Sequence, residues 1–281
     1  MMIVNELKQH GTADFPFELY KVDRLHPRYV MTFHWHVSVE LIRVISGELS
    51  LTLDHRSYRL RAGEFALVNS ETVHGATPHD CIYEVIVFNL AFLKTGNPVC
   101  DGFIDDLLSH VSFLKERPEN EDVARAFHNV FEQMDDVQTT GAPPFKALGA
   151  FLNLLGEIER NVSFTSNVNA TLYDEKRIGK LKAVLEFLHG HYAEELTLDD
   201  LSNVANLSRK YFCKFFKDMT GTTPFQYLTT YRVEKAARQL LITKLPVTEI
   251  ALDCGFNDLS YFIKTFKARK GISPNQYRKS F

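Results

Sequence analysis

The stretch Ser208-Arg-Lys-Tyr-Phe-Cys-Lys-Phe-Phe-Lys-Asp-Met-Thr-Gly-Thr-Thr-Pro224 decides the fold, because an edited copy of it begins fifty positions later. The copy reads Asp258-Leu-Ser-Tyr-Phe-Ile-Lys-Thr-Phe-Lys-Ala-Arg-Lys-Gly-Ile-Ser-Pro274. Nine of the seventeen residues from Tyr211 to Tyr227 are identical to the residue fifty positions further on, without a gap. A repeat of this kind indicates a duplicated structural unit.

Each copy is predicted to form a short basic helix. The pairs Phe212 and Phe216, and Phe262 and Phe266, lie one helical turn apart and share the buried face. A glycine ends each helix, and a second amphipathic segment precedes it. Two helices joined by a short turn, with cations on the outer face of the second, form the helix-turn-helix pattern. We expect one unit at 197–220 and another at 247–270.

The charge of the chain is unevenly distributed. The 281 residues carry 32 Lys and Arg against 35 Asp and Glu. From Glu175 onward there are 18 cations against 11 acids, which leaves 14 against 24 before it. A basic last third beside an acidic remainder indicates a polyanionic partner for the last third only.

Residues 17–92 alternate between apolar and polar side chains in short runs. We expect turns between these runs, among them Ser46-Gly47 and Thr77-Pro78. Short strands separated by such turns are typical of an antiparallel sandwich or barrel. The fold class is therefore α+β, with a β domain first and a helical domain last.

One group of residues in this region has the spacing of metal ligands. His34-Trp-His36, Glu40 and Gly47 are followed later by His74. On a strand His34, His36 and Glu40 would point to one face, so that with His74 they converge. The pattern resembles the first cupin metal motif, whereas Asn69-Ser70 stands where the second motif has Pro-x-Gly.

Three interpretations of His34, His36, Glu40 and His74 remain open. They could form a pocket that hydrogen-bonds a small polar effector. They could hold a divalent metal such as Zn, Fe, Mn or Ni, although no cofactor is certain. They could also hydrogen-bond one another around a solvated barrel mouth. The remaining histidines, His26 and His10 among them, are expected to be solvent-facing or without a ligand role.

The middle of the chain changes to a helical period. Apolar stripes predict helices within about 100–160, and the last of them carries a broad apolar seam. This seam consists of Leu148, Phe151, Leu152, Leu155 and Ile158. It can pack on the barrel or against a second subunit. Residues 161–174 are polar, rich in Ser, Thr and Asn, and predicted to be a linker.

The last hundred residues resemble the DNA-binding domain of AraC-type (AraC/XylS) transcription regulators. The resemblance runs through Ile250-Ala, Gly255-Phe256, Tyr261-Phe262, Phe266-Lys267, Gly271-Ile-Ser-Pro274 and Tyr277-Arg278. It extends over nearly the whole chain, because a cupin-like half with a helical dimerisation segment is similar to the sensor domain of the same family. The expected domains are 1–160 for sensing and dimerisation (barrel about 17–95), the linker 161–174, and 175–281 for DNA binding.

The resemblance implies that a long helix, Phe225–Ile242, places two recognition helices in successive major grooves. About eighteen residues give roughly 27 Å, against about 34 Å between grooves. It also implies that seven positions face base edges: Lys210, Cys213, Lys214, Leu259, Ser260, Ile263 and Lys264. Arg209, Lys217 and Lys267 are expected to hold phosphates. The alternative for any one of these lysines is a solvated surface charge.

The sequence thus predicts a transcription regulator that binds an operator in double-stranded DNA as a homodimer and responds to a small molecule, such as a sugar. If it is an activator, RNA polymerase is a further partner. The alternatives are a metal-dependent cupin enzyme with a DNA-binding appendage, and an architectural DNA-bending protein.

The cellular compartment is predicted from what the sequence lacks. Its four cysteines, Cys81, Cys100, Cys213 and Cys254, show no paired spacing. The first residues contain no apolar signal core, and no apolar run approaches the roughly 18 residues needed to span a membrane. We therefore expect a reduced, cytoplasmic protein without a membrane partner.

Overall fold

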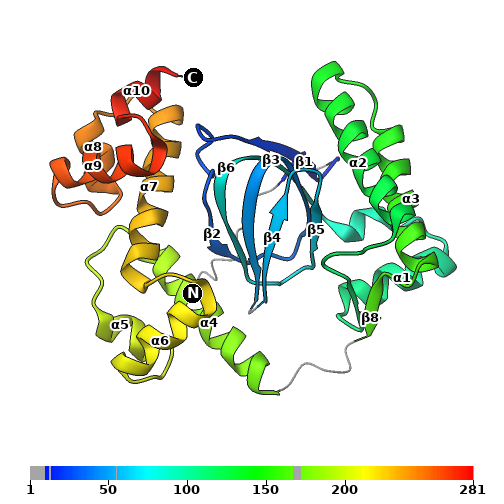
Figure 1. The fold of residues 1–281 in the computed structure, drawn as a ribbon, viewed down its shortest axis with the longest axis horizontal. Coiled ribbons are helices and arrows are strands. Elements are labelled where there is room, and N and C mark those ends of the chain that lie inside the picture. Colours follow the sequence, from blue (N-terminus) through cyan, green and yellow to red (C-terminus); the bar gives the residue numbers. More distant parts are fainter. Residues whose placement is uncertain (1–9, 13, 55, 167–171, 281) are drawn as a thin grey trace.

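The computed structural model describes residues 10–12, 14–54, 56–166 and 172–280. Parts of the predicted first domain (1–9, 13 and 55) and of the predicted linker (167–171) lie outside the described residues. The β-barrel lies between two helical parts of the chain (Figure 1). The first helical part follows the barrel in sequence, and the second is the C-terminal domain.

The barrel is one antiparallel sheet. Its strands are β1 (Phe17–Val22), β2 (Met31–His34), β3 (Val39–Leu53), β4 (Arg56–Arg61), β5 (Phe65–Val68) and β6 (His74–Phe88). The strand order is β1-β6-β3-β4, with β2 paired to β6 and β5 paired to β3. The long strands β3 and β6 pair from Val39 with Phe88 to Leu53 with His74, and they carry the other strands.

The predicted turns at Ser46-Gly47 and Thr77-Pro78 are wrong, because β3 and β6 continue through both places. The register shifts around Ser46 instead, which is a β-bulge. Gly47 has a φ of 75°, and a Cβ there would lie 2.2 Å from the Asp80 carbonyl oxygen. Only glycine therefore fits this close crossing of the two strands.

The first helical part packs on the outside of the barrel. It contains the short helix η1 (Leu90–Leu93), then α1 (Pro98–Leu108), β7 (Ser112–Leu114), α2 (Glu121–Thr140), α3 (Phe145–Arg160) and β8 (Phe164–Ser166). The ring of Phe151 lies 4.8 Å from those of Phe17 and Phe88, in a core shared with the barrel. Most of the predicted apolar seam covers the barrel, whereas Leu152 remains 39% exposed.

Within its described residues, the C-terminal domain contains seven helices, among them those of the two predicted helix-turn-helix units and the long helix between them. These are α4 (Leu172–Gly190), α5 (Leu198–Val204), α6 (Arg209–Thr220), α7 (Pro224–Ile242), α8 (Val247–Asp253), α9 (Leu259–Lys270) and α10 (Pro274–Lys279). Helix α7 joins two units, α5–α6 and α8–α9, and each has its own apolar core. The two copies end their second helix in the same way, because Gly221 and Gly271 both adopt the left-handed conformation.

Candidate nucleic-acid interface and interdomain pocket

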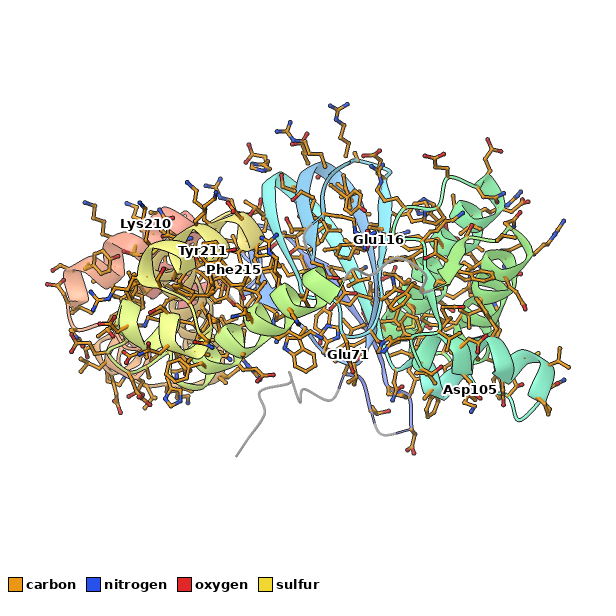
Figure 2. The ribbon with its side chains drawn as sticks, turned by 90° about the horizontal axis from the view of Figure 1, so that it is seen from below. Glu71, Asp105, Glu116, Lys210, Tyr211 and Phe215 are labelled. Carbon is orange, nitrogen blue, oxygen red and sulfur yellow. The ribbon has the colours of Figure 1, made fainter. Side chains whose placement is uncertain are left out.

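Helix α6 presents a basic face to the outside. Phe212 and Phe216 are fully buried, and this leaves Lys210, Lys214 and Lys217 exposed, with Cys213 half-buried. Figure 2 shows Lys210 at the outer edge of the C-terminal domain. The Arg209 guanidinium is also exposed, but it already donates to the carboxylate of Asp199.

Helix α9 presents a less basic outer face. Its predicted contact residues are all exposed: Leu259, Ser260, Ile263, Lys264 and Lys267. Leu259 and Ile263 are each 38% exposed, so two apolar side chains reach the surface of this helix. Tyr211 on α6 and Tyr261 on α9 are 49% and 54% exposed. Both tyrosines therefore belong to the outer surface.

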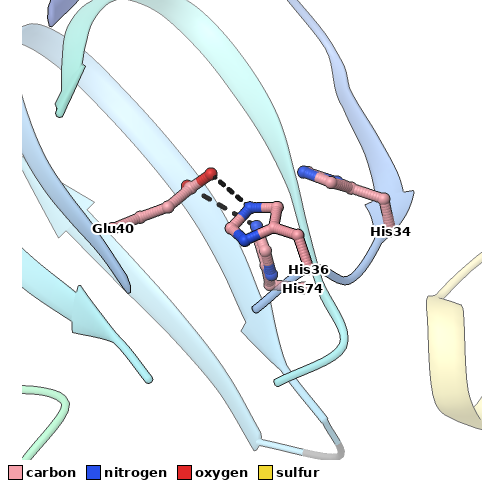
Figure 3. A group of neighbouring side chains, drawn as sticks. All are labelled: His34, His36, Glu40 and His74. Carbon is pink, nitrogen blue, oxygen red and sulfur yellow. Dashed lines mark hydrogen bonds and ion pairs between the residues drawn. The ribbon is translucent and has the colours of Figure 1, made fainter. Parts of the chain in front are cut away.

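The predicted convergence of His34, His36, Glu40 and His74 is confirmed. One ligand atom from each residue lies within 4.8 Å of those of the others. The residues do not share one strand, since His34 ends β2, His36 lies in the following turn, Glu40 is on β3 and His74 begins β6. Figure 3 shows Glu40 directed at His36 and His74.

The three imidazoles are oriented by backbone carbonyls. Each Nδ1 lies near one of them, 2.9 Å (His34 to Thr32), 3.1 Å (His36 to Ser38) and 2.8 Å (His74 to Thr72). A carbonyl only accepts, so each Nδ1 carries a proton and Nε2 is directed to the centre. Metal-binding histidines are commonly held in this way.

The Glu40 carboxylate completes the cluster. One oxygen lies 2.8 Å from His36 Nε2 and the other 3.5 Å from His74 Nε2. Burial opposes ionisation of Glu40, but His74 and His36 outweigh it, so that the pKa of this carboxyl lies well below its usual range. The cluster therefore combines an ionised carboxylate with three imidazoles, the donor set expected for a divalent cation.

Comparison with known proteins identifies the family. Residues 201–280 match a helix-turn-helix domain, and residues 22–80 match a cupin domain. The chain is 32% identical to the probable transcriptional regulator LumQ of Photobacterium leiognathi, over 88% of this chain and 92% of that protein. The chain belongs to the AraC-type transcription regulators.

Other relatives agree. The uncharacterized HTH-type transcriptional regulator YdeC of Bacillus subtilis (strain 168) is 25% identical over 98% of this chain and 96% of its own length. The melibiose operon regulatory protein of Escherichia coli (strain K12) is 24% identical over 90% and 85%. This AraC-type regulator thus combines a helix-turn-helix DNA-binding domain with a cupin domain, which is consistent with sensing of an effector. None of its described helices is long and apolar enough to cross a membrane.

A pocket of about 310 Å³ lies between the two domains of the regulator. The barrel contributes Tyr83 and the cluster residues His34 and Glu40 to its wall. The opposite wall comes from the DNA-binding domain, with Leu185 and His189 on α4 and four residues on α7. These four are Tyr231, Glu234, Lys235 and Arg238. The histidine and carboxylate cluster is therefore at one end of a space that also touches the long helix.

Sequence reasoning missed this second wall and two histidines near it. His26, expected to face solvent, lines the pocket. His10 is 7% exposed, with its ring 6.1 Å from that of His36. Neither residue has a motif that could have revealed it. Glu234 did offer a signal, because it stands beside Val233 and two residues before Ala236, on the apolar side of α7.

Proposed function

We propose that one chain of this regulator reads two successive major grooves with α6 and α9. The nineteen residues of α7 give a rod of about 28 Å, close to the groove separation of about 34 Å. Both outer faces are exposed, so the docked barrel does not cover them. Lys210, Lys214 and Lys264 are suited to guanine edges, and Leu259 and Ile263 to thymine methyl groups.

The remaining predicted contacts have supporting roles in this proposal. Cys213 and Ser260 face bases beside them, and Lys217, Lys267 and Arg209 hold phosphates, which supplies affinity without sequence choice. To bind a phosphate, the Arg209 guanidinium would have to give up its hydrogen bonds to Asp199 or bind both groups at once.

We propose that the interdomain pocket binds the small-molecule effector. The observation that supports this is its double wall, since the barrel and α4 and α7 of the DNA-binding domain line one space. A molecule that touches both domains binds the docked arrangement with a different affinity from any other arrangement. Such a difference is what a ligand needs to shift a conformational equilibrium.

A thermal-shift screen of the full chain tests this proposal. Sugars, organic acids and divalent metals would be compared on the parent, on Val30→Phe, which places a larger side chain in the pocket wall, and on Val37→Phe, an exposed control outside it. A binder at one hundred times its Kd stabilises the parent by about 2.7 kcal/mol. We expect this stabilisation in the parent and in the control but not in Val30→Phe. In the parent and the control, the compound should also change the affinity for DNA. A stabilising compound that Val30→Phe binds equally well would refute the pocket assignment.

We further propose that His34, His36, Glu40 and His74 hold a divalent transition metal such as Zn, Fe, Mn or Ni. The three oriented imidazoles support it, because the proton between His36 and Glu40 is the one a cation would replace. The ion would tie β2, β3 and β6 together and place positive charge at the end of the pocket. We propose no catalysis, since the relatives carry the names of transcription regulators.

Metal analysis of the purified chain tests the site. Stoichiometric metal is expected in the parent and in His79→Ala, whose histidine is exposed, contacts Ser50 and is not one of the four clustered residues. His36→Ala and Glu40→Ala should lose it. Equal metal content in all four proteins would show that the ion binds elsewhere.

We also propose that the regulator acts in the cytoplasm as a homodimer, and contacts RNA polymerase if it activates transcription. One face of α3 offers a contact surface between subunits, because Phe145 is 83% and Leu152 is 39% exposed. Gly149 and Gly156 lie on the same face, with open space where a Cβ would be.

A further inference from the structure

Both helix-turn-helix units are attached to the barrel through the same position of the repeat. Tyr227 and Tyr277 lie fifty positions apart and are 2% and 0% exposed. The Tyr227 hydroxyl donates to the Phe33 carbonyl, and the Tyr277 hydroxyl donates to the Leu25 carbonyl at 2.6 Å. Burial raises the pKa of both phenols, so each remains protonated and able to donate.

The first unit is also attached by apolar packing. Phe33 and Val73 of the barrel are 8% and 0% exposed and belong to the same core as Phe212 and Phe216 of α6. Trp35 packs beside them, with the Lys182 ammonium of α4 4.4 Å from the centre of its ring. Separating this unit from the barrel would expose a shared hydrophobic core to water, which is costly.

The second unit is attached by polar groups. Its core cluster contains only residues of the C-terminal domain among those the structure describes. Lys270, the last residue of α9, is 1% exposed. Its ammonium donates to the Pro27 carbonyl at 2.9 Å and to Glu234 Oε2 at 2.6 Å. Arg24 packs over Gly271, with guanidinium atoms 3.2–3.3 Å from where a Cβ would lie.

The matched position in the first unit makes no such link. Thr220 corresponds to Lys270, and its hydroxyl donates within its own unit, to the Phe216 carbonyl at 2.8 Å. Gly221 corresponds to Gly271, and no described atom lies within 4 Å of its Cβ position. The contacts of Lys270 and Gly271 with the barrel side are therefore specific to the second copy, whereas the tyrosine hydrogen bond is common to both.

These polar groups border the interdomain pocket. Glu234 on α7, and His26 and Pro27 on the β1–β2 connection, line it. Hydrogen bonds to backbone carbonyls can be exchanged for bonds to water at a small net cost, unlike the apolar contact of the first unit. A molecule in the pocket thus lies against the attachment of the second unit.

We propose that Lys270, Tyr277 and Glu234 form a polar latch with the carbonyls of Leu25 and Pro27. Because of this latch, the second helix-turn-helix unit is the one that can be released from the barrel. Occupation of the pocket opens the latch. The last part rests on the proposed effector site, whereas the existence of the latch does not. Release would free α9 from a fixed position relative to the barrel while α6 stays docked. A molecule bound in the pocket would thereby change how α9 contacts the second major groove.

Lysine labelling with mass spectrometry tests the latch on the full chain. The rate at Lys270 is measured relative to the exposed Lys267 on the same helix. Tyr277→Phe keeps the ring and removes one hydrogen bond, so we expect labelling about threefold to tenfold faster. Tyr227→Phe, the matched position, and Tyr58→Phe, whose hydroxyl bonds the remote Glu116, should leave the rate unchanged.

Hydrogen exchange separates a latch from a merely structural role. In Tyr277→Phe and in the double variant Glu234→Gln/Lys270→Met, amides of residues 23–30 should exchange about threefold to tenfold faster, while those in the core of α9 keep their parent rates. Unchanged Lys270 labelling in Tyr277→Phe, or faster exchange throughout α9, would overturn the latch.

The coupling to the pocket is tested with Val30→Phe, whose added ring serves as the occupant. We expect Lys270 to be labelled at least about threefold faster than in the parent. An unchanged rate would overturn the coupling and leave the latch standing. If the thermal-shift screen finds no effector while Tyr277→Phe still accelerates labelling, the proposed effector function fails and the latch does not.

Discussion

In both helix-turn-helix units a pair of phenylalanines one turn apart is fully buried, and the following glycine donates its N–H to a lysine carbonyl of the same helix, that of Lys217 or Lys267. Both units then start the next helix with the same capping box, Thr223 with Gln226 and Ser273 with Gln276.

The units differ at several positions of their outer and inner surfaces. On the outer face, Lys210 and Cys213 of α6 correspond to Ser260 and Ile263 of α9. On the inner side, Thr220 corresponds to Lys270, which crosses to the barrel. The duplication has therefore kept the residues that form the unit, together with Tyr227 and Tyr277, and has changed several residues of the outer and inner surfaces. The two copies can therefore differ in function while they keep the same helix-turn-helix structure.

The largest expected effect concerns the buried phenylalanines that both units share. Phe216→Ala and Phe266→Ala each remove a fully buried ring, and each should cost about 3–5 kcal/mol of stability. The two variants should differ in how far the damage spreads, because only Phe216 shares a core with Phe33 and Val73. Denaturant unfolding measures the cost, and hydrogen exchange at β2 should accelerate in Phe216→Ala alone. Equal effects on β2 would contradict the different attachment of the units.

A smaller effect is expected at the outer faces. Lys214→Ala should weaken binding to the preferred DNA site by about 1–3 kcal/mol, since a lysine at a guanine edge contributes on this scale. Lys264→Ala should cost less, because the exposed face of α9 has fewer cations than that of α6 and more apolar side chains. Titration of a selected DNA site at fixed salt measures both variants. If Lys214→Ala binds this site as tightly as the parent, its assignment to a base contact is wrong.

A pH dependence of stability is expected from Glu234 on α7. Burial raises the pKa of Glu234 to about 7, although Lys270, Arg269 and Arg28 lower it. The folded form thus keeps a proton that the unfolded form loses above its ordinary pKa of 4.5. This contribution to stability is complete below pH 4.5 and is lost as the pH rises to about 7, with a slope of at most about 1.4 kcal/mol per pH unit.

Comparison with Glu234→Gln isolates this titration, because glutamine keeps the shape and cannot ionise. The free energy of unfolding of the parent should fall relative to that of the variant between pH 5 and 7. Parallel pH profiles would show that Glu234 does not exchange a proton with solvent in this range.

The C-terminal domain was predictable because its signals are local. Apolar spacing, the capping residues, Gly221 and Gly271 determine the helices through contacts within a few residues. Because of the repeat, the same pattern occurs twice in the sequence. Helix α7 accordingly ends at the predicted Ile242 and begins at Pro224, one residue before the predicted Phe225.

The barrel and the docking were less predictable because distant residues decide them. Gly47 and Pro78 read as turns, yet long-range pairing of β3 with β6 carries both strands through them. The convergence of His34, His36, Glu40 and His74 was predicted on strand parity and is produced by a turn between β2 and β3. The approach of Lys270 to Pro27 spans most of the chain, and no spacing in the sequence reveals it.

The short piece of chain from Arg24 to His36 takes part in three arrangements at once. It carries two of the clustered histidines, packs Phe33 into the first DNA-binding unit and offers the carbonyls that hold the second. The cupin domain and the DNA-binding domain therefore cannot be exchanged independently between relatives. A chimera of this protein with a relative, joined at the connection near residues 161–174, should transmit its signal only if residues 24–36 come from the same parent as the DNA-binding half.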